Sequence, residues 1–424
     1  WLKFIICLQF FADRIPRSVS MPPKKEEGKT NDESRLGKML TRLAFGTPMI
    51  MFFFVLVWLG HPYLCGLVVF LQVGLFRELV NVKYQNKKEK EKDNDEEAPI
   101  PLFRTMQWCM FSVAMWQTYT KTFLKLGLVN SLMRRLPFIA PYVQETIRYK
   151  NFITFSAYVA MFVTFVITLT KKNAKQQIGH LVWTIAVLCL VVWQIAGTAY
   201  LIFQGLFWFM LPCGLVVAND CWAYFCGLSL GKKLIKAEFF ALSPKKTWEG
   251  FIGGGILTLI WAWLYSDWIS NSEWLVCPQT DLVTYADLRC TPSPMFQVQD
   301  IKLPYADFTL INVKAKPVQL HALILGVFAS VVAPFGGFLA SAIKRAHNIK
   351  DFAELVPGHG GLMDRMDCQF LMLLCTYIHF NTFVADGSLH HSERESKIIQ
   401  AFLMLPEANR LAMIETLKST FNLG

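Results

Sequence analysis

The chain has few charged residues for its length. Asp, Glu, Lys and Arg make up only 17% of its 424 residues, whereas 54% are hydrophobic and the mean hydropathy is +0.35. Soluble domains of this total length need a polar surface, but helices that face lipid do not. The scarcity of charge therefore argues against a soluble protein and predicts an all-α, polytopic membrane protein.

Several familiar binding and catalytic patterns are absent. The sequence contains no Walker A loop, no HExxH pair, no CxxC pair, no internal repeat and no heptad pattern. No basic face with interleaved aromatic residues lies outside the apolar runs, which argues against nucleic acid as a partner. The missing motifs argue against a P-loop NTPase and a zinc protease, and they are compatible with a nucleotidyl transfer at a membrane.

Most of the eleven cysteines lie inside apolar runs, where buried free thiols account for them. Cys277 and Cys290 differ, because both lie in one polar loop. A disulfide between them would suit a loop that faces an oxidising lumen. The sequence alone leaves this pairing open.

Apolar runs that alternate with polar loops predict about nine transmembrane helices. Several of the runs are shorter than the roughly 20 residues that a span needs. The runs cover residues 47–60, 62–80, 103–119, 152–170, 178–197, 199–218, 251–266, 319–340 and 368–385.

The same pattern divides the chain into four regions. We expect a disordered cytoplasmic start at 1–45, in which Met21 is the native first residue and 1–20 are not native. The amino-terminal transmembrane helices follow at 46–218, then a catalytic transmembrane region with cytosolic loops at 219–386, and a carboxyl-terminal tail at 387–424.

The net charge of +11 reflects an excess of Lys and Arg in the loops, which predicts their side of the membrane. The long loop 267–318 then faces the lumen. Residues 120–151 are basic yet fall on the lumenal side, so that either they form interfacial helices or a span is miscounted. The loops expected in the cytosol are 81–102, 171–177, 219–250 and 341–367.

The first polar constellation contains two adjacent lysines. Ser243 and Pro244 predict a helix start, with Ser243 as the N-cap. Lys245 and Lys246 would then lie in the first turn, where positive charge is unfavourable unless an anion binds to the free N–H groups. This favours a triphosphate or pyrophosphate site over a solvated lysine pair.

Acidic residues lie on either side of these lysines. Asn219 and Asp220 end an apolar run, either as a polar pair between helices or as part of the site. Glu249 either orients a lysine or a metal-bound water, or only balances charge.

The second constellation, SAIKRAHNIKDFAELVPGHGGLMDRMD, covers residues 341–367 and ends an apolar run. Ser341 and Lys344 share a helical face. The glycines of the Pro-Gly-His-Gly-Gly turn let backbone N–H groups approach a ligand. Asp364 and Asp367 point one way from the next helix and suit Mg²⁺ or Mn²⁺ that bridges phosphate oxygens, although a salt-bridge site between helices is the alternative. Arg365 between them would hold a phosphate.

This second constellation resembles the signature of phosphatidate cytidylyltransferases, also called CDP-diacylglycerol synthases. One departure is Val356, where the family usually has Leu, Ile or Phe. Residues 243–250 are similar to a second block of that family, and Asn219-Asp220 to a third. The likeness extends from about residue 40 to the end, and it is greatest for the eukaryotic branch of the endoplasmic reticulum.

The resemblance implies that the protein transfers the cytidylyl group of CTP to phosphatidic acid with Mg²⁺, as a homodimer with its site facing the cytosol. Asp364 and Asp367 would hold the metal, with Asp220 or Asp351 completing its coordination. The implied catalytic residues are Asp364, Asp367, Lys344 and Asp351. The implied substrate-binding residues are Ser243, Lys245, Lys246, Ser341, Arg345, Lys350, His359, Gly360, Gly361 and Arg365.

Other readings of the residues stay open. His359 either positions the turn or transfers a proton, but the lipid phosphate is already ionised at neutral pH and needs no base. A CTP-dependent lipid kinase of the dolichol type would give CDP in place of pyrophosphate. A transporter with an intramembrane ion site, or a non-catalytic scaffold, would leave the lysines near Ser243 unexplained.

Overall fold

The computed structural model describes most of the expected membrane region. The chain forms two compact units, Trp1–Thr376 and Tyr377–Gly424, which are considered separately. Met21, the segment 1–20 and most of the expected tail lie outside the described residues. The description covers residues 31–90, 102–171, 174–237, 239, 246–279, 290–305, 308–349, 351–353, 360–385, 402, 409–410 and 412–416.

Most of the described residues are helical, which confirms the all-α prediction. Their one sheet is an antiparallel hairpin of β1 (Gln299–Tyr305) and β2 (Phe308–Ala315), inside the loop expected in the lumen. The first described helix, α2 (Asn31–Leu59), corrects the expected disordered start, because residues 31–45 are helical. Two acidic residues near its N-terminus, Asp32 and Glu33, favour a helix there.

Five helical stretches of the described chain are long and apolar enough to cross a membrane, and the chain is an integral membrane protein. The expected count of nine is not confirmed. The runs at 103–119, 251–266 and 368–385 lie in α4 (Phe103–Lys125), α11 (Trp248–Ser270) and α15 (Met363–His379), none of which is both long and apolar enough. The five stretches are His61–Lys83, Lys150–Thr168, Ala174–Phe203, Phe207–Leu230 and Pro317–Ala346, and a shorter apolar helix covers Gly46–Leu59.

The run at 319–340 forms two helices, not one. α13 (Pro317–Val331) ends before Pro334, and α14 (Pro334–Ala346) begins there. Proline has no N–H and cannot continue the ladder of an α-helix, and the N–H of Ala333 donates to the carbonyl of Phe328, five residues back. Hydropathy continues through this break, so the apolar pattern did not reveal it.

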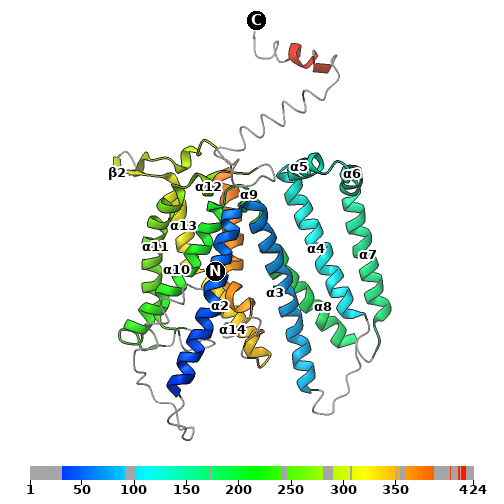
Figure 1. Ribbon diagram of the computed structural model, residues 1–424, viewed down its shortest axis with the longest axis horizontal. Coiled ribbons are helices and arrows are strands. Elements are labelled where there is room, and N and C mark those ends of the chain that lie inside the picture. Colours follow the sequence, from blue (N-terminus) through cyan, green and yellow to red (C-terminus); the bar gives the residue numbers. More distant parts are fainter. Residues whose placement is uncertain are drawn as a thin grey trace. The chain divides into compact units, whose positions relative to one another are not determined.

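The carboxyl-terminal half is assembled around a close contact between α10 (Phe207–Leu230) and α11. A Cβ on Gly254 would lie 2.8 Å from the Cβ of Ala223, and one on Gly250 would lie 2.8 Å from the carbonyl of Ala223. Such small residues let helix backbones approach in a membrane, where packing contacts hold helices together. The contact fixes the start of α11 against α10 (Figure 1).

The amino-terminal half is held by buried polar contacts between α3 (His61–Lys90), α4 and α8 (Ala174–Leu188). The Gln72 side chain donates to the carbonyl of Val191 at 2.9 Å and accepts from Tyr119 at 2.6 Å. Val191 lies in a short π-helix, Cys189–Trp193, that leads through residues 194–197 to α9 (Thr198–Phe203). These contacts fix the face of α3 that supports the site described below.

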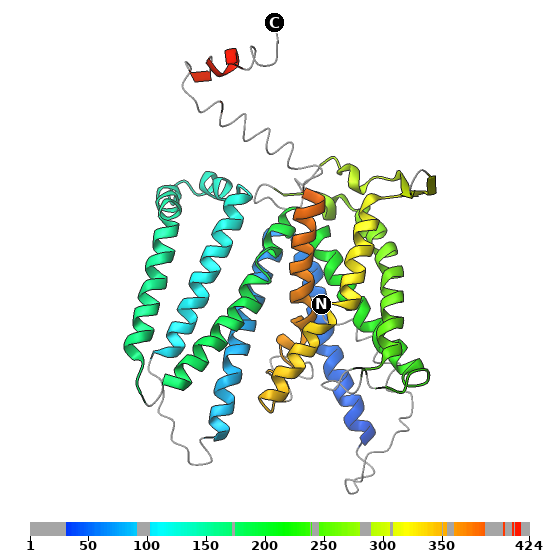
Figure 2. The ribbon, with the colours of Figure 1, turned by 180° about the vertical axis from the view of Figure 1, so that it is seen from behind.

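The two ends of the helices differ. α5 (Leu128–Arg135) and α6 (Ala140–Arg148) link α4 to α7 (Lys150–Thr168), and they lie at the same end as α12 (Glu273–Val276) and β2; α14 reaches the opposite end (Figures 1 and 2). Two short helices that end in arginines are what the interfacial alternative for residues 120–151 predicted. No membrane-spanning helix is described within residues 120–149.

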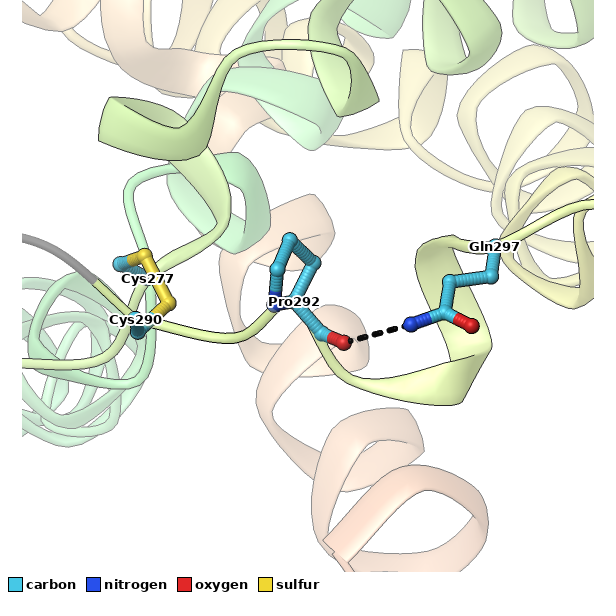
Figure 3. The surroundings of a disulfide bond; sticks show 4 residues. All are labelled: Cys277, Cys290, Pro292 and Gln297. Atoms are coloured by element: carbon cyan, nitrogen blue, oxygen red, sulfur yellow. Dashed lines mark hydrogen bonds between the residues drawn. A yellow bond between two sulfur atoms is a disulfide. The ribbon is translucent and has the colours of Figure 1, made fainter.

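A disulfide closes the loop after α12. Cys277 and Cys290 are bonded, with their Cα atoms 5.8 Å apart, which answers the question left open by the sequence. Figure 3 shows the segment that follows, in which the side chain of Gln297 donates to the carbonyl of Pro292 at 3.1 Å.

Candidate active site

The site is built where α14 ends. The N–H of Asn348 donates to the carbonyl of Arg345 at 3.2 Å, and the N–H of Ile349 donates to the carbonyl of Lys344 at 3.0 Å. With Asn348 in the left-handed region at φ 53°, this is a Schellman termination. It turns the chain back sharply, so that residues 351–353 return toward the first turn of α15.

Two glycines let α14 lie directly against α15. A Cβ on Gly336 would overlap the carbonyl oxygen of Asp367, and one on Gly337 would lie 3.3 Å from its carboxylate oxygen Oδ2. The contact brings the carboxylate of Asp367 to the surface of α14. Asp364 lies three residues earlier on the same helix and therefore on the same side.

Asp364 joins three separate segments. Its Oδ1 forms an ion pair with Nζ of Lys344 at 2.6 Å, and both side chains are largely buried, with 11% and 23% of their surface exposed. Its Oδ2 accepts the N–H groups of Phe352 and Gly361, each at 3.3 Å. This ion pair joins α14 to α15 and is of the kind that the alternative of a salt-bridge site between helices predicts for Asp364.

Gly360 brings a second carboxylate to the same place. It has φ of 75°, a conformation that favours glycine. A Cβ built there would lie 3.5 Å from Oδ2 of Asp364 and 3.7 Å from Oδ1 of Asp351. The two carboxylates therefore flank one backbone position, and Asp351 is exposed to solvent.

Sequence reasoning missed Glu78, which reaches this turn from α3. Its Oε2 accepts the N–H groups of Leu362 and Met363 at 2.9 and 3.1 Å. The side chain is 5% exposed. An acidic residue inside an apolar run is a signal of a functional or paired group, and Glu78 within the run 62–80 carried that signal.

The helix start expected at Ser243 is wrong. α11 begins at Trp248, and its N-cap is Thr247, whose hydroxyl accepts the N–H of Gly250 at 3.2 Å. Lys246 thus precedes the helix and does not lie in its first turn. Glu249 occupies that turn, where a negative charge suits the helix dipole, so no unfavourable lysine charge has to be explained.

Lys246 nevertheless lies near the second constellation. Its Nζ is 4.8 Å from the ring centre of Phe338, which is the neighbour of Gly337 on α14. Lys246, from the segment before α11, and Asp364, in the first turn of α15, thus both contact α14. The other expected residues of this segment, Ser243 and Lys245, lie outside the described residues, as do Lys350 and His359.

Glu249 holds a loop in place. Its Oε1 accepts the N–H groups of Leu234 and Ile235 at 3.1 and 2.8 Å, so it contacts the segment after α10. Hydrogen bonds from backbone N–H groups, above all that of Ile235, lower the pKa of Glu249 to about 2, which keeps the carboxylate ionised. Glu249 lies outside the five candidate spans.

The remaining expected residues that the structure describes lie on α10, α14 and α15. The hydroxyl of Ser341 donates to the carbonyl of Gly337 at 2.8 Å. Arg345 is exposed, and Arg365 is half-buried. On α10, Asn219 accepts the hydroxyl of Thr258 at 3.2 Å, which fits the alternative of a polar link between helices, and the adjacent Asp220 is half-buried.

The described carboxylates fit a metal that is shared with substrate. Within the part of the chain that the structure describes, no group of three or more His, Cys, Asp and Glu side chains can hold a metal ion by itself. Mg²⁺ usually binds through one or two carboxylates and completes its coordination with waters and substrate phosphates. Asp351 and Asp364, with oxygen ligands only and both beside Gly360, are a donor set of this kind.

Comparison with known proteins gives the family. The sequence profile of the cytidylyltransferase family matches residues 40–383. The chain belongs to the cytidylyltransferase family. A cytidylyltransferase is a nucleotidyltransferase, which agrees with the acidic and basic groups gathered around Asp364.

Individual cytidylyltransferases from plants and animals are similar over most of their length. The chain is 37% identical to phosphatidate cytidylyltransferase 1 of Arabidopsis thaliana over 368 residues, which cover 85% of this chain and 82% of the relative. It is 39% identical to phosphatidate cytidylyltransferase 3 of the same plant over 335 residues, or 78% and 68% of the two chains. With phosphatidate cytidylyltransferase 1 of Rattus norvegicus the identity is 35% over 377 residues, or 87% and 76%.

Proposed function

We propose that this cytidylyltransferase transfers the cytidylyl group of CTP to phosphatidic acid, which yields CDP-diacylglycerol and pyrophosphate. The observation that carries the proposal is the ion pair of Lys344 and Asp364 at the end of a membrane helix, beside a glycine turn and a second carboxylate. The names of the relatives, all phosphatidate cytidylyltransferases, support the same substrate pair.

The reaction is an in-line displacement at phosphorus. An oxygen of the lipid phosphate attacks the α-phosphorus of CTP, the bond to the β-phosphate breaks, and pyrophosphate leaves with the electron pair. The attacking oxygen is already ionised, so no general base is required. The barrier comes from bringing two anions together, and positive charge fixed at the site lowers it.

The residues of this chain divide that task. Lys344 and Arg345 end α14 at the site, Arg365 lies between the two aspartates, and Lys246 lies over Phe338 on the same helix. We assign the binding of the triphosphate and the lipid phosphate to these cations. Asp364, Asp367 and Asp351 would hold Mg²⁺, which when bound neutralises phosphate charge; Asp220 stays a further predicted ligand.

We also propose that the site faces the cytosol from the membrane of the endoplasmic reticulum and that the enzyme is a homodimer, as the family resemblance implies. The disulfide supports the orientation, because it requires an oxidising compartment and lies with α12 at the end opposite α14. CTP would then reach the site from the cytosol.

The test uses purified protein in detergent micelles with phosphatidate, Mg²⁺ and CTP that is labelled at either the α- or the γ-phosphorus. We expect the α-label to appear in the lipid and the γ-label in pyrophosphate. A lipid kinase would instead place the γ-label in the lipid, and that outcome would refute the proposal.

The matched variant for this assay is Asp367→Asn. It keeps the shape of the side chain and removes its charge, so it should insert and fold normally and lose nearly all turnover. Near-normal activity would show that Asp367 does not bind metal.

A further inference from the structure

Glu78 is an acidic residue of α3 that lies inside a candidate membrane span, and only 5% of its surface is exposed. A carboxylate in such a place is unfavourable unless hydrogen bonds compensate for the loss of water. Its hydrogen bonds run to residues that follow it by 284 and 285 positions, at the start of α15. A buried acidic side chain at such a position indicates a specific structural or catalytic role.

The partners of Glu78 are the free N–H groups of a helix end. Met363 is the first residue of α15, and the first N–H groups of any helix have no partner within the helix. Glu78 accepts those of Leu362 and Met363, and Asp364 accepts that of Gly361. The carboxyl groups of Glu78 and Asp364 thus share three successive N–H groups at the start of α15.

The surfaces of α3 and the turn are matched in shape. A Cβ on Gly361 would overlap the carboxylate of Glu78. One turn earlier on α3, a Cβ on Gly74 would lie 2.6 Å from the side chain of Leu362. Gly74 and Glu78 are four residues apart and share a face of α3. This face therefore receives the turn at two adjacent points.

We propose that Glu78 is a positioning residue for the cytidylyl transfer: its Oε2 fastens the start of α15 and so fixes the direction of Asp364 and Asp367. It acts as a hydrogen-bond acceptor and binds neither substrate nor metal. The inference rests on the proposed function, because it needs Asp364 to hold the metal.

The test compares Glu78→Ala with Glu78→Gln. Alanine removes the acceptor, so we expect the Mg²⁺ concentration for half-maximal activity, and the dissociation constant of Mn²⁺ measured by electron paramagnetic resonance without CTP, to rise about tenfold or more. Glutamine keeps an oxygen for Leu362 and Met363 and should stay within about threefold of the original protein in both measurements.

A control separates positioning from plain destabilisation. Leu75→Ala removes a fully buried side chain from the same helix and leaves the Glu78 acceptor in place, so it should lower the melting temperature and leave the Mn²⁺ affinity of the folded protein unchanged. Size-exclusion chromatography and thermal unfolding establish that each variant is folded.

The outcomes are distinct. If Glu78→Ala folds and binds Mn²⁺ as tightly as the original protein does, the inference is overturned. It is also overturned if Glu78→Gln loses as much Mn²⁺ affinity as Glu78→Ala, because a hydrogen-bond acceptor at this position would then not be sufficient. If the labelled-CTP assay places the γ-label in the lipid, the proposed function fails. If Asp364→Asn stays active, the metal-binding role of Asp364 fails and the positioning role of Glu78 fails with it. If Asp364→Asn is inactive while Glu78→Ala behaves as the original protein, only the positioning role fails.

Discussion

Position 361 requires glycine because the side chain of Glu78, from α3, occupies the space that any larger residue would need. A methyl group there would overlap the carboxylate of Glu78, which is buried, so that one of the two groups would have to shift. The glycine of the signature thus serves packing, besides the backbone access to a ligand that the sequence predicts. Both uses come from the same missing side chain.

We predict that Gly361→Ala lowers kcat by about a hundredfold, because displacing a catalytic group by about 1 Å has an effect of this size. The measurement is the rate of liponucleotide formation at saturating CTP. Gly66→Ala is the matched control, since a Cβ on Gly66 meets nothing within 4 Å. It should keep full activity and stabilise α3 by up to about 1 kcal/mol. Equal effects of the two substitutions would refute the packing argument.

The sequence predicted the individual members of the site better than their contacts. Lys344 and Asp364 could be assigned to one constellation in advance, because both belong to one short, charge-rich segment that ends an apolar run, but their ion pair was not predicted. Glu78 could not be connected to them, because nothing local indicates which buried acid faces which helix end. The contact arises only when α3 packs against the start of α15.

At the scale of helices, the end of α14 determines where the reactive turn begins. Asn348 is exposed and makes no core contact that its replacement would remove, but its left-handed conformation is needed for the two hydrogen bonds to Lys344 and Arg345. The return of Asp351 and Phe352 toward Asp364 depends on this one backbone conformation.

We predict that Asn348→Val destabilises the protein by about 1–2 kcal/mol, since a side chain with a branched Cβ is disfavoured in the left-handed region. Activity should fall with it. Asn348→Gly should be neutral in both respects, because glycine adopts this conformation freely. Thermal unfolding and the liponucleotide assay check the pair, and a harmless valine would show that the turn does not need this geometry.

Helix boundaries were the weak part of the prediction. Ser243-Pro244 and Thr247 with Glu249 are both acceptable helix starts by local chemistry, and the sequence gives no ground to choose between them. Close packing of Gly250 against Ala223 and Gly227 accompanies the second start. Likewise, Pro334 lies within a continuous apolar run, so hydropathy alone joined α13 to α14.

At the scale of the whole amino-terminal unit, α12, which directly precedes Cys277, and α14, whose end begins the site, lie toward opposite ends of the helices (Figures 1 and 2). The loop closed by Cys277 and Cys290 makes its own contacts, among them the hydrogen bond from Gln279 to the carbonyl of Phe203 at 2.8 Å. Stability and catalysis should therefore respond separately to changes in this loop.

We predict that the double substitution Cys277→Ser with Cys290→Ser lowers the stability by about 2–4 kcal/mol, a typical value for a lost disulfide. The rate of liponucleotide formation by the folded protein should stay within about twofold. Thermal unfolding with and without reductant checks the first part. A large loss of kcat in the folded protein would show that the two ends are coupled.

The support that α3 gives to the turn has a consequence for how such chains are recognised. A shortened transcript that began after α3 would still encode every letter of the family signature and would be classified with the enzymes. It would nevertheless lack α3, whose Glu78 accepts hydrogen bonds from the start of α15, so we expect its product to be inactive. Motif content alone is therefore a poor guide to which isoforms of such a protein make liponucleotide.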